Sequence, residues 1–196
     1  MPIRTIADVE SGSRYWDLAR LFLLSALGAA LTAVGSRIAI PFWPVPVTLQ
    51  VFFVLLCGVA LGRKWGALAQ AEYVAAGLMG LPVFAGGRAG PAALLGPTGG
   101  YLVGFIAAAY ATGWLAEVLG NRRGGLLAAT LAGAAMIWCF GWAWLAVWAA
   151  AGGEAEPLRA AFGWGVIPFL AVDIAKAMVA AALGHALIHT FGGRKR

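Results

Sequence analysis

Residues 80–105 read GLPVFAGGRAGPAALLGPTGGYLVGF and separate two strongly apolar helical segments of the chain. This stretch is too rich in glycine and proline to form a lipid-facing span. Irregular backbone at bilayer depth persists only where protein or a cavity satisfies its N–H and C=O groups. We therefore expect a folded-in loop that lines a binding site, with Pro97 and Thr98 beginning the next helix.

The composition indicates an integral membrane protein. Of the 196 residues, 62% are hydrophobic and only 11% are charged, whereas soluble domains carry about 25% charged residues. The length suits one compact domain. We expect residues 1–16 to form a cytoplasmic or interfacial N-terminal segment and residues 17–196 to form a single membrane domain. The N-terminus lacks the features of a cleaved signal peptide.

The apolar segments predict an all-α integral membrane protein with six transmembrane helices. Connections rich in proline, glycine or charge separate these segments, and such residues end helices. The expected helices cover residues 17–36, 47–61, 65–79, 98–119, 125–151 and 167–190. The second of them is short for a span, which needs about 20 residues.

Lysine and arginine residues divide unequally between the two ends of these helices. With the N-terminus inside, ten fall on the inner side and three on the outer side. The inner set is Arg4, Arg14, Arg20, Arg63, Lys64, Arg122, Arg123, Arg194, Lys195 and Arg196, and the outer set is Arg37, Arg88 and Arg159. Because short cytoplasmic loops carry the excess of basic residues, both termini are expected in the cytoplasm. The net charge of +6 then reflects membrane topology rather than nucleic-acid binding.

Four ionisable side chains fall within predicted spans, and one of them, Glu117, lies near an inner helix end. A charge at a helix centre costs about 2.5–3.5 kcal/mol, so the others need a partner or a function. Asp173 and Lys176 are three residues apart and share a helix face. They could neutralise each other, or they could clamp a ligand such as a cyclic urea, which both donates and accepts hydrogen bonds. Glu72 could pair with a cation near the cavity or extend to the interface.

Further polar candidates lie near the outer helix ends. Thr48 and Gln50 follow a proline-rich connection, and Tyr73 lies on the third predicted helix. Each could bind a ligand or make an ordinary hydrogen bond between helices. Arg88, in the glycine-rich loop, could meet a ligand carboxylate or face water.

Several other kinds of site are not predicted. His185 and His189 have a spacing that can bind a metal, but no acidic residue accompanies them in sequence. Cys57 and Cys139 lie in apolar segments without the spacing of a zinc site or a disulfide framework. The sequence has no GxxxxGK[ST], GxSxG or HExxH motif. We therefore predict no metal, no cofactor and no catalytic residue.

Four segments together resemble the BioY family, which comprises the biotin-specific S components of energy-coupling factor (ECF) transporters. They are PVPVTLQ (44–50), YVAAGLMGLPVFAGG (73–87), GPTGGYLVGF (96–105) and PFLAVDIAKAMVA (168–180). The resemblance covers roughly residues 18–187. It implies the six-helix S-component fold, with a biotin site near the outer face of the cytoplasmic membrane.

The resemblance also implies roles for individual residues. It implies that Asp173 and Lys176 contact the ureido ring of biotin. Gln50, Tyr73, Gly86 and Gly87 match cavity-lining positions of the family, and Thr48 lies beside them. Two residues, Arg88 and Glu72, depart from the commonest pattern of the family, which leaves the carboxylate end of the ligand unassigned.

Partner proteins are implied in the same way. Ala26 and Ala30 have the spacing that lets another helix approach closely, although internal packing would explain it equally. They match the family surface that docks on a transmembrane T component, and two cytoplasmic ATPases would supply energy. Three alternatives stay open: an S component for another vitamin, a carrier or channel without ATPases, and an intramembrane enzyme that uses Asp173 or Glu72 as a base.

Overall fold

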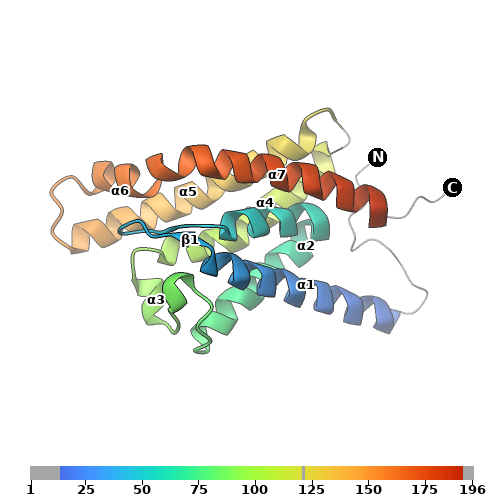
Figure 1. Ribbon diagram of the computed structural model, residues 1–196, viewed down its shortest axis with the longest axis horizontal. Coiled ribbons are helices and arrows are strands. Elements are labelled where there is room, and N and C mark those ends of the chain that lie inside the picture. Colours follow the sequence, from blue (N-terminus) through green and yellow to red (C-terminus); the bar gives the residue numbers. More distant parts are fainter. Residues whose placement is uncertain (1–13, 121, 192–196) are drawn as a thin grey trace.

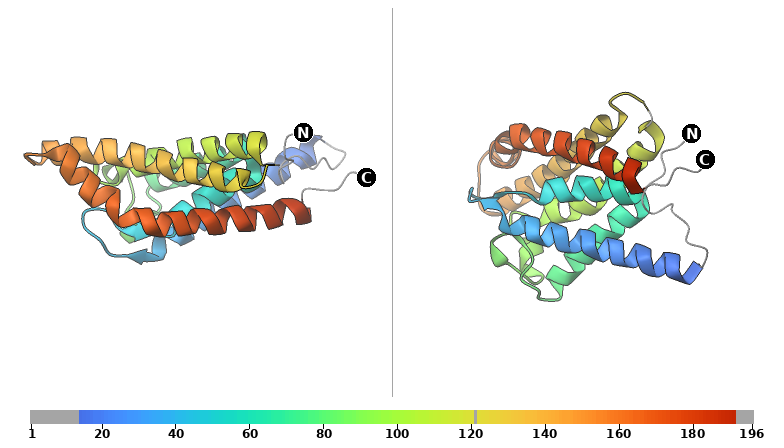
Figure 2. Two further views of the ribbon diagram at one scale, coloured as in Figure 1. Left: turned by 90° about the horizontal axis from the view of Figure 1, so that it is seen from above. Right: turned by 45° about the vertical axis from the view of Figure 1, so that its right-hand side comes forward.

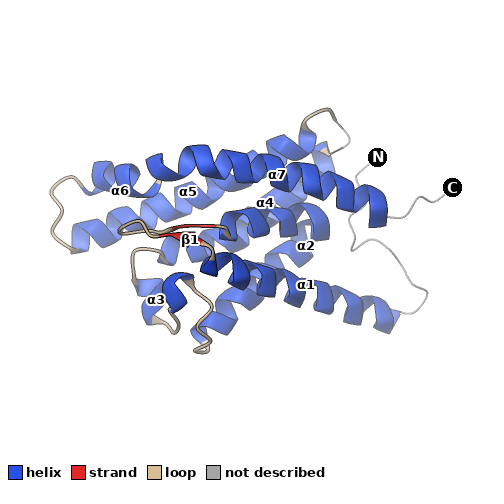
Figure 3. Ribbon diagram, in the orientation of Figure 1, coloured by secondary structure: helices blue, strands red, loops and turns tan. Residues whose placement is uncertain are grey.

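The computed structural model describes residues 14–120 and 122–191, which fold mainly into long helices (Figures 1 and 3). The long helices are α1 (Arg14–Arg37), α2 (Gln50–Leu78), α4 (Gly99–Leu119), α5 (Gly125–Ala151) and α7 (Ile167–Phe191). The short elements are β1 (Ala39–Ile40), β2 (Val47–Thr48), η2 (Ala85–Gly87), α3 (Ala92–Leu95) and α6 (Pro157–Gly165). Within the described residues, five helical segments are long and apolar enough to cross a membrane. The chain is therefore a multi-pass membrane protein, as predicted.

Helix α2 contains two of the six predicted helices, joined at a sharp bend. Gly62, inside it, has φ 79° and ψ 175°, a conformation that glycine adopts without steric cost. Beyond the bend the chain turns back on itself, so that the second arm packs against the first. A Cβ atom added to Gly66 would lie only 2.8 Å from the carbonyl oxygen of Cys57. At 1.5 Å per residue the two arms, residues 50–61 and 63–78, are about 18 and 24 Å long.

Helix α2 lies at the centre of the bundle. It packs on α1, α4 and α7, while α5 packs on α4, α6 and α7. Glycines allow this close packing: a Cβ atom on Gly58 would lie 2.7 Å from the carbonyl oxygen of Ala109 in α4. The bend of α2, the α4–α5 turn and the end of α7 lie at one end of the bundle (Figures 1 and 2). The loops after α1 and α5 lie at the other end. The two predicted sets of connections are thus at opposite ends, and which end is cytoplasmic stays a prediction.

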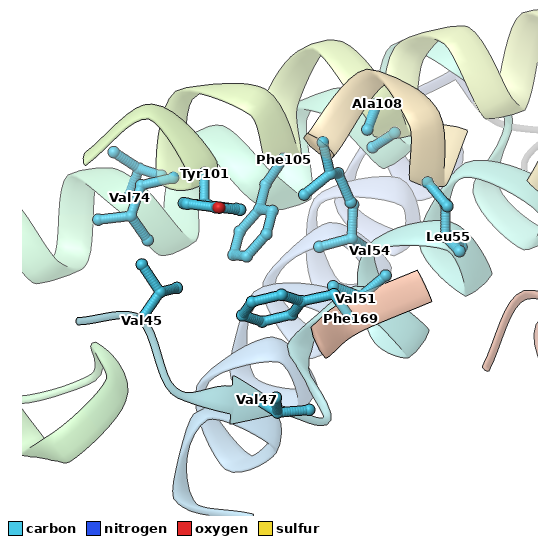
Figure 4. Packing of buried hydrophobic residues seen from close by; sticks show 14 of the residues in the cluster. Val45, Val47, Val51, Val54, Leu55, Val74, Tyr101, Phe105, Ala108 and Phe169 are labelled. Atoms are coloured by element: carbon cyan, nitrogen blue, oxygen red, sulfur yellow. The ribbon is translucent and has the colours of Figure 1, made fainter. Parts of the chain in front are cut away.

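The main core joins side chains from elements that are far apart in the sequence (Figure 4). Buried residues come from the loop before β2, from both arms of α2, and from α4, α5 and α7. The labelled members are Val45, Val47, Val51, Val54, Leu55, Val74, Tyr101, Phe105, Ala108 and Phe169. This core holds the loop before β2 against the helices at the end of the bundle where the polar site lies.

Three predicted boundaries are wrong. Val47 and Thr48 form β2, which pairs with β1 in antiparallel register, instead of the first turn of a helix. The β-branched Val and Thr suit a strand. In β1, Ile40 pairs with Val47 and precedes Pro41, which favours extended backbone in the residue before it. Residues 157–165, which were not predicted as a helix, form α6 with Pro157 in its first turn. Helix α1 begins at Arg14, inside the expected N-terminal segment, and residues 1–13 of that segment lie outside the described residues.

Candidate functional site

A buried ion pair lies at the centre of the site. Lys176 Nζ is 2.6 Å from Asp173 Oδ1, and the two residues are 9% and 1% exposed. The indole N–H of Trp138 donates to Asp173 Oδ2 at 3.0 Å, and Lys176 donates to the carbonyl oxygen of Thr48 at 2.7 Å. A buried pair needs such additional hydrogen bonds to offset its desolvation. The three-residue spacing therefore places both charges on the inner face of α7, tied to α5 and to β2.

A second polar network shares Thr48 with the first. The Thr48 hydroxyl donates to Gln50 Oε1 at 2.9 Å, and Gln50 Nε2 donates to the Tyr73 hydroxyl at 2.6 Å. The Tyr73 hydroxyl donates in turn to the carbonyl oxygen of Val83 at 3.2 Å. All three side chains are buried. The network connects the two arms of α2 to the loop after α2. Three of the predicted site residues, Thr48, Gln50 and Tyr73, therefore belong to one hydrogen-bonded system, with Asp173 and Lys176 beside it.

A small cavity of about 40 Å³ lies against these networks. The polar side chains in its lining are Thr48, Gln50, Thr98, Tyr101 and Asp173, and the apolar ones include Val45, Phe84, Phe105 and Phe169. Small-molecule pockets measure about 300–1,000 Å³. A ligand of vitamin size would therefore require the lining segments to move apart.

The glycine-rich loop is folded in, as predicted. Phe84 and Ala85 are buried and line the cavity. The hydroxyl of Ser36 donates to the carbonyl oxygen of Val83 at 2.7 Å, which ties the loop to α1. Gly86 and Gly87 are not in the lining. Their φ values of 72° and 75° form the turn that directs Phe84 inward, a conformation that favours glycine.

Arg88 bridges the two halves of the loop. Its Nε donates to the carbonyl oxygen of Ala85 at 3.1 Å, and its Nη2 donates to the Thr98 hydroxyl at 3.1 Å. Both acceptors belong to residues of the cavity lining. The guanidinium group is therefore at the edge of the cavity and is only partly exposed to solvent.

The remaining predicted residues lie away from the cavity. Glu72 faces α1, where its Oε1 accepts a hydrogen bond from the Ser25 hydroxyl at 2.9 Å, so it neither pairs with a cation at the cavity nor extends to the interface. Glu117 pairs with Arg63 at 3.3 Å beside the bend of α2. Ala26 and Ala30 lie on the exposed face of α1.

Three residues with polar groups at the site were not predicted. Trp138 bonds Asp173, and Thr98 and Tyr101 line the cavity. The Tyr101 ring stacks on Phe169 with centroids 6.1 Å apart, and its hydroxyl donates to the carbonyl oxygen of Gly165 at 2.7 Å. A buried tryptophan or tyrosine needs a hydrogen-bond partner, but the chain has nine tryptophans, and nothing in the sequence distinguishes Trp138 from the others.

A larger groove, of about 720 Å³, lies between α3, α4 and α5. Its walls are almost entirely apolar, and the indole N–H of Trp144 in its lining already donates to the carbonyl oxygen of Gly96 at 2.8 Å. It offers no set of polar groups that could orient a ligand. The smaller cavity beside Asp173 is therefore the better candidate site.

The chain is similar to known proteins over most of its length. The chain matches the sequence profile of the BioY family over residues 8–193. It is 43% identical over 164 residues to the "Biotin transporter BioY" of Thermotoga maritima, covering 84% of this chain and 93% of that one. It is 42% identical, with the same coverage, to the "Probable biotin transporter BioY" of Pyrococcus horikoshii.

The fold also matches a solved structure, the crystal structure of "the S-component for biotin from an ECF-type ABC transporter". The TM-score is 0.75 at 24% identity, and the match covers 90% of this chain and 94% of that one. At this identity the likeness concerns the fold, which is that of an S component with its helices in the same arrangement. The profile match covers nearly the whole chain and the relatives are matched over most of their length. This chain belongs to the BioY family.

Proposed function

We propose that this protein is the biotin-binding S component of an ECF transporter and mediates biotin uptake. The observation that carries the proposal is the buried Asp173–Lys176 pair beside a cavity. The matched relatives from Thermotoga maritima and Pyrococcus horikoshii are named as biotin transporters, which favours biotin over another vitamin. As a transporter component the chain is not an enzyme.

The hydrogen-bonding capacity of the pair suits a cyclic urea. Each carboxylate oxygen of Asp173 accepts one hydrogen bond, from Lys176 or Trp138, and has a further lone pair. The ammonium group of Lys176 has three N–H bonds and uses two of them, toward Asp173 and Thr48. The ureido group of biotin offers two N–H donors and one carbonyl acceptor. Asp173 would accept the N–H groups, and Lys176 or the Gln50 amide would donate to the carbonyl oxygen.

The rest of the cavity suits the rest of biotin. Phe84, Phe105 and Phe169 provide an apolar surface for the fused rings and the aliphatic chain, whose burial contributes about 25 cal/mol per Å². We propose that Arg88 binds the carboxylate at the edge of the cavity. It would exchange its hydrogen bond to the neutral Thr98 hydroxyl for an ion pair with the carboxylate, in which both partners are charged. Tyr73 would hold the loop through its hydrogen bond to the carbonyl oxygen of Val83, and Gly86 and Gly87 would form the turn of the loop.

Biotin titration into the purified protein, followed by calorimetry, tests the function. We expect saturable one-to-one binding, with no comparable heat from riboflavin, thiamin or pantothenate. Tight binding of one of these instead would show an S component for another vitamin. A folded sample that binds none of them would contradict the proposal. Accumulation of biotin in vesicles that contain this chain alone would favour the stand-alone carrier, and release of a chemically altered ligand would favour an enzyme.

Trp138→Phe is expected to weaken biotin binding about ten- to hundredfold while the protein stays folded. The substitution keeps most of the ring but removes the N–H that bonds Asp173, and a hydrogen bond to a charged group contributes about 1.5–3 kcal/mol. Calorimetry measures the effect. The matched control is Trp142→Phe, because the Trp142 indole donates to the carbonyl oxygen of Leu158 at 3.0 Å, outside the site. Equal affinity in the two variants would remove Trp138 from the site.

Arg88→Gln is expected to weaken biotin binding about tenfold or more, because a charge-assisted hydrogen bond to the ligand is lost. Biotin amide, in which the carboxylate is replaced by a neutral carboxamide, should bind the parent and the variant equally. Competition between the two ligands measures this difference. Arg159→Gln removes an equal charge from an exposed position and serves as the control. A loss of the same size for both ligands would mean that Arg88 supports the loop only.

Energy for uptake is proposed to come from partners. The sequence has no nucleotide-binding loop of the GxxxxGK[ST] type, and a binding protein alone only shifts a conformational equilibrium. We propose that a transmembrane T component and two cytoplasmic ATPases form the complete transporter in the cytoplasmic membrane. The exposed face of α1, with Ala26 and Ala30 beside the exposed Leu23 and Leu27, is the proposed docking surface. Co-purification of all three partners with this chain, and its loss on Ala26→Trp, tests the assignment.

A further inference from the structure

A second polar cleft, of about 470 Å³, lies between the α4–α5 turn and the last turns of α7. It is at the opposite end of the bundle from the loops around the biotin cavity (Figures 1 and 2). Arg122 and Arg123 contribute from the turn, and His185 and His189 contribute from α7. The four side chains come from two segments about 60 residues apart, so the tertiary fold assembles the cleft.

Among the described residues, no carboxylate neutralises the positive charge of this cleft. Within the part of the chain that the structure describes, neither Arg122 nor Arg123 forms an ion pair. Glu117, the carboxylate near the end of α4, is engaged by Arg63 at 3.3 Å and by the backbone N–H of Arg63 at 3.0 Å. The arginine pair therefore presents its full charge to whatever enters the cleft.

The backbone adds further donors on the same wall. Gly124, with φ 74°, precedes the first turn of α5, and Leu126 and Leu127 in that turn line the cleft. Their N–H groups find no backbone acceptor among the described residues. The N-terminus of a helix, with its free N–H groups and positive dipole end, favours an anion. The imidazoles of His185 and His189, whose ring centroids are 4.2 Å apart, could donate to the same group.

Part of the lining of the cleft is apolar. Leu126, Ala181 and Ile188 belong to it together with the arginines and histidines. A lining that holds both cationic and apolar side chains matches a molecule with an anionic head and a hydrocarbon tail. A water-soluble anion would leave the apolar part unexplained.

We propose that this cleft binds the phosphate headgroup of an anionic phospholipid of the phosphatidylglycerol class, with an acyl chain against its apolar part. Arg122 and Arg123 would pair with the phosphate. The positive-inside pattern predicts that this end faces the cytoplasm, and basic pockets between helices on that side suit anionic lipids. The bound lipid would hold α7, which carries Asp173 and Lys176, against the α4–α5 turn.

Native mass spectrometry of the whole protein, with phosphatidylglycerol and phosphatidylcholine added at equal concentration, tests the proposal. We expect one retained phosphatidylglycerol, with affinity reduced roughly 30-fold in Arg122→Gln/Arg123→Gln, because each basic residue near an anionic lipid surface contributes about a fivefold factor. Lys64→Gln/Arg159→Gln removes the same formal charge from two exposed residues outside the cleft and should retain the lipid. Size-exclusion profiles and biotin binding show that each variant is folded.

Two outcomes would overturn the proposal. The first is equal retention of phosphatidylglycerol by the cleft variant and the Lys64→Gln/Arg159→Gln control, which would make the effect one of net charge. The second is that inorganic phosphate or glycerol phosphate raises the melting temperature as much as the lipid does, which would make the site one for a soluble phosphate. Because the biotin site uses other residues, failure of this proposal would leave biotin binding unaffected.

Discussion

Asp173→Asn is expected to abolish biotin binding, with a loss of affinity of at least about a hundredfold. The asparagine keeps the size of the side chain but removes the charge that the Lys176 ammonium and the Trp138 indole both contact. Leaving a buried ammonium without its partner costs about 3–5 kcal/mol. Calorimetric titration measures the affinity, and thermal unfolding measures the stability.

Two further variants separate binding from stability. In Asp173→Asn/Lys176→Met both buried charges are gone, so thermal stability should return toward that of the parent while biotin binding stays absent. Glu156→Gln breaks an ion pair with the same three-residue spacing, but its side chains are 86% and 67% exposed, and such pairs contribute about 0–1 kcal/mol. It should change neither quantity. Affinity within threefold of the parent in Asp173→Asn would reduce the pair to a structural role.

Gly77→Ala is expected to displace the glycine-rich loop, with loss of biotin binding and of thermal stability. A Cβ atom at Gly77 would overlap the ring of Phe84, which packs against α2 there. Phe84 also lies edge-on to Tyr73, with centroids 5.6 Å apart, so moving it disturbs the second polar network. Overpacking of a core costs about 1–3 kcal/mol or more. Thermal unfolding and calorimetry report the two losses.

Gly163→Ala is the matched control for this prediction. A Cβ atom on Gly163, in α6, would meet no atom within 4 Å. Alanine is also the better helix former, so this variant should be as stable as the parent or slightly more so. If Gly77→Ala bound biotin with unchanged affinity, the loop would not be held by Phe84, and its inward position would need another cause.

The long helices could be predicted from the sequence with small errors. The structure confirms 125–151, and the predicted 167–190 differs from α7 by one residue. In a bilayer every backbone polar group must be satisfied within the segment, so a long apolar stretch has few alternatives to a helix. The short elements were missed. β1 and β2 exist only because they pair with each other, and α6 is too short for composition to identify.

The charged centre of the site could be predicted for a similar reason. Few ionisable side chains lie inside the spans, and their cost makes each of them conspicuous. Glu72 shows the limit of this argument, since it is equally conspicuous but bonds Ser25 on α1 instead of lying at the cavity. The position of Glu72 depends on its contact with Ser25 on another helix, and the two residues are 47 positions apart in the chain.

The sequence by itself determined that this is a multi-pass helical membrane protein of the BioY family, with Asp173 and Lys176 on one helix face and a loop folded in between helices. The family follows from the four segments that resemble it, and the other properties follow from composition, local spacing and the cost of exposing polar groups to lipid. Only the tertiary structure decided that Gly62 folds α2 back and that Trp138 bonds Asp173. It also decided that Phe84, rather than Gly86 or Gly87, lines the cavity. The cleft that Arg122 and His185 share is a further result of the tertiary structure. These contacts join residues whose encounter depends on how helices pack, and packing is set by the whole set of facing side chains.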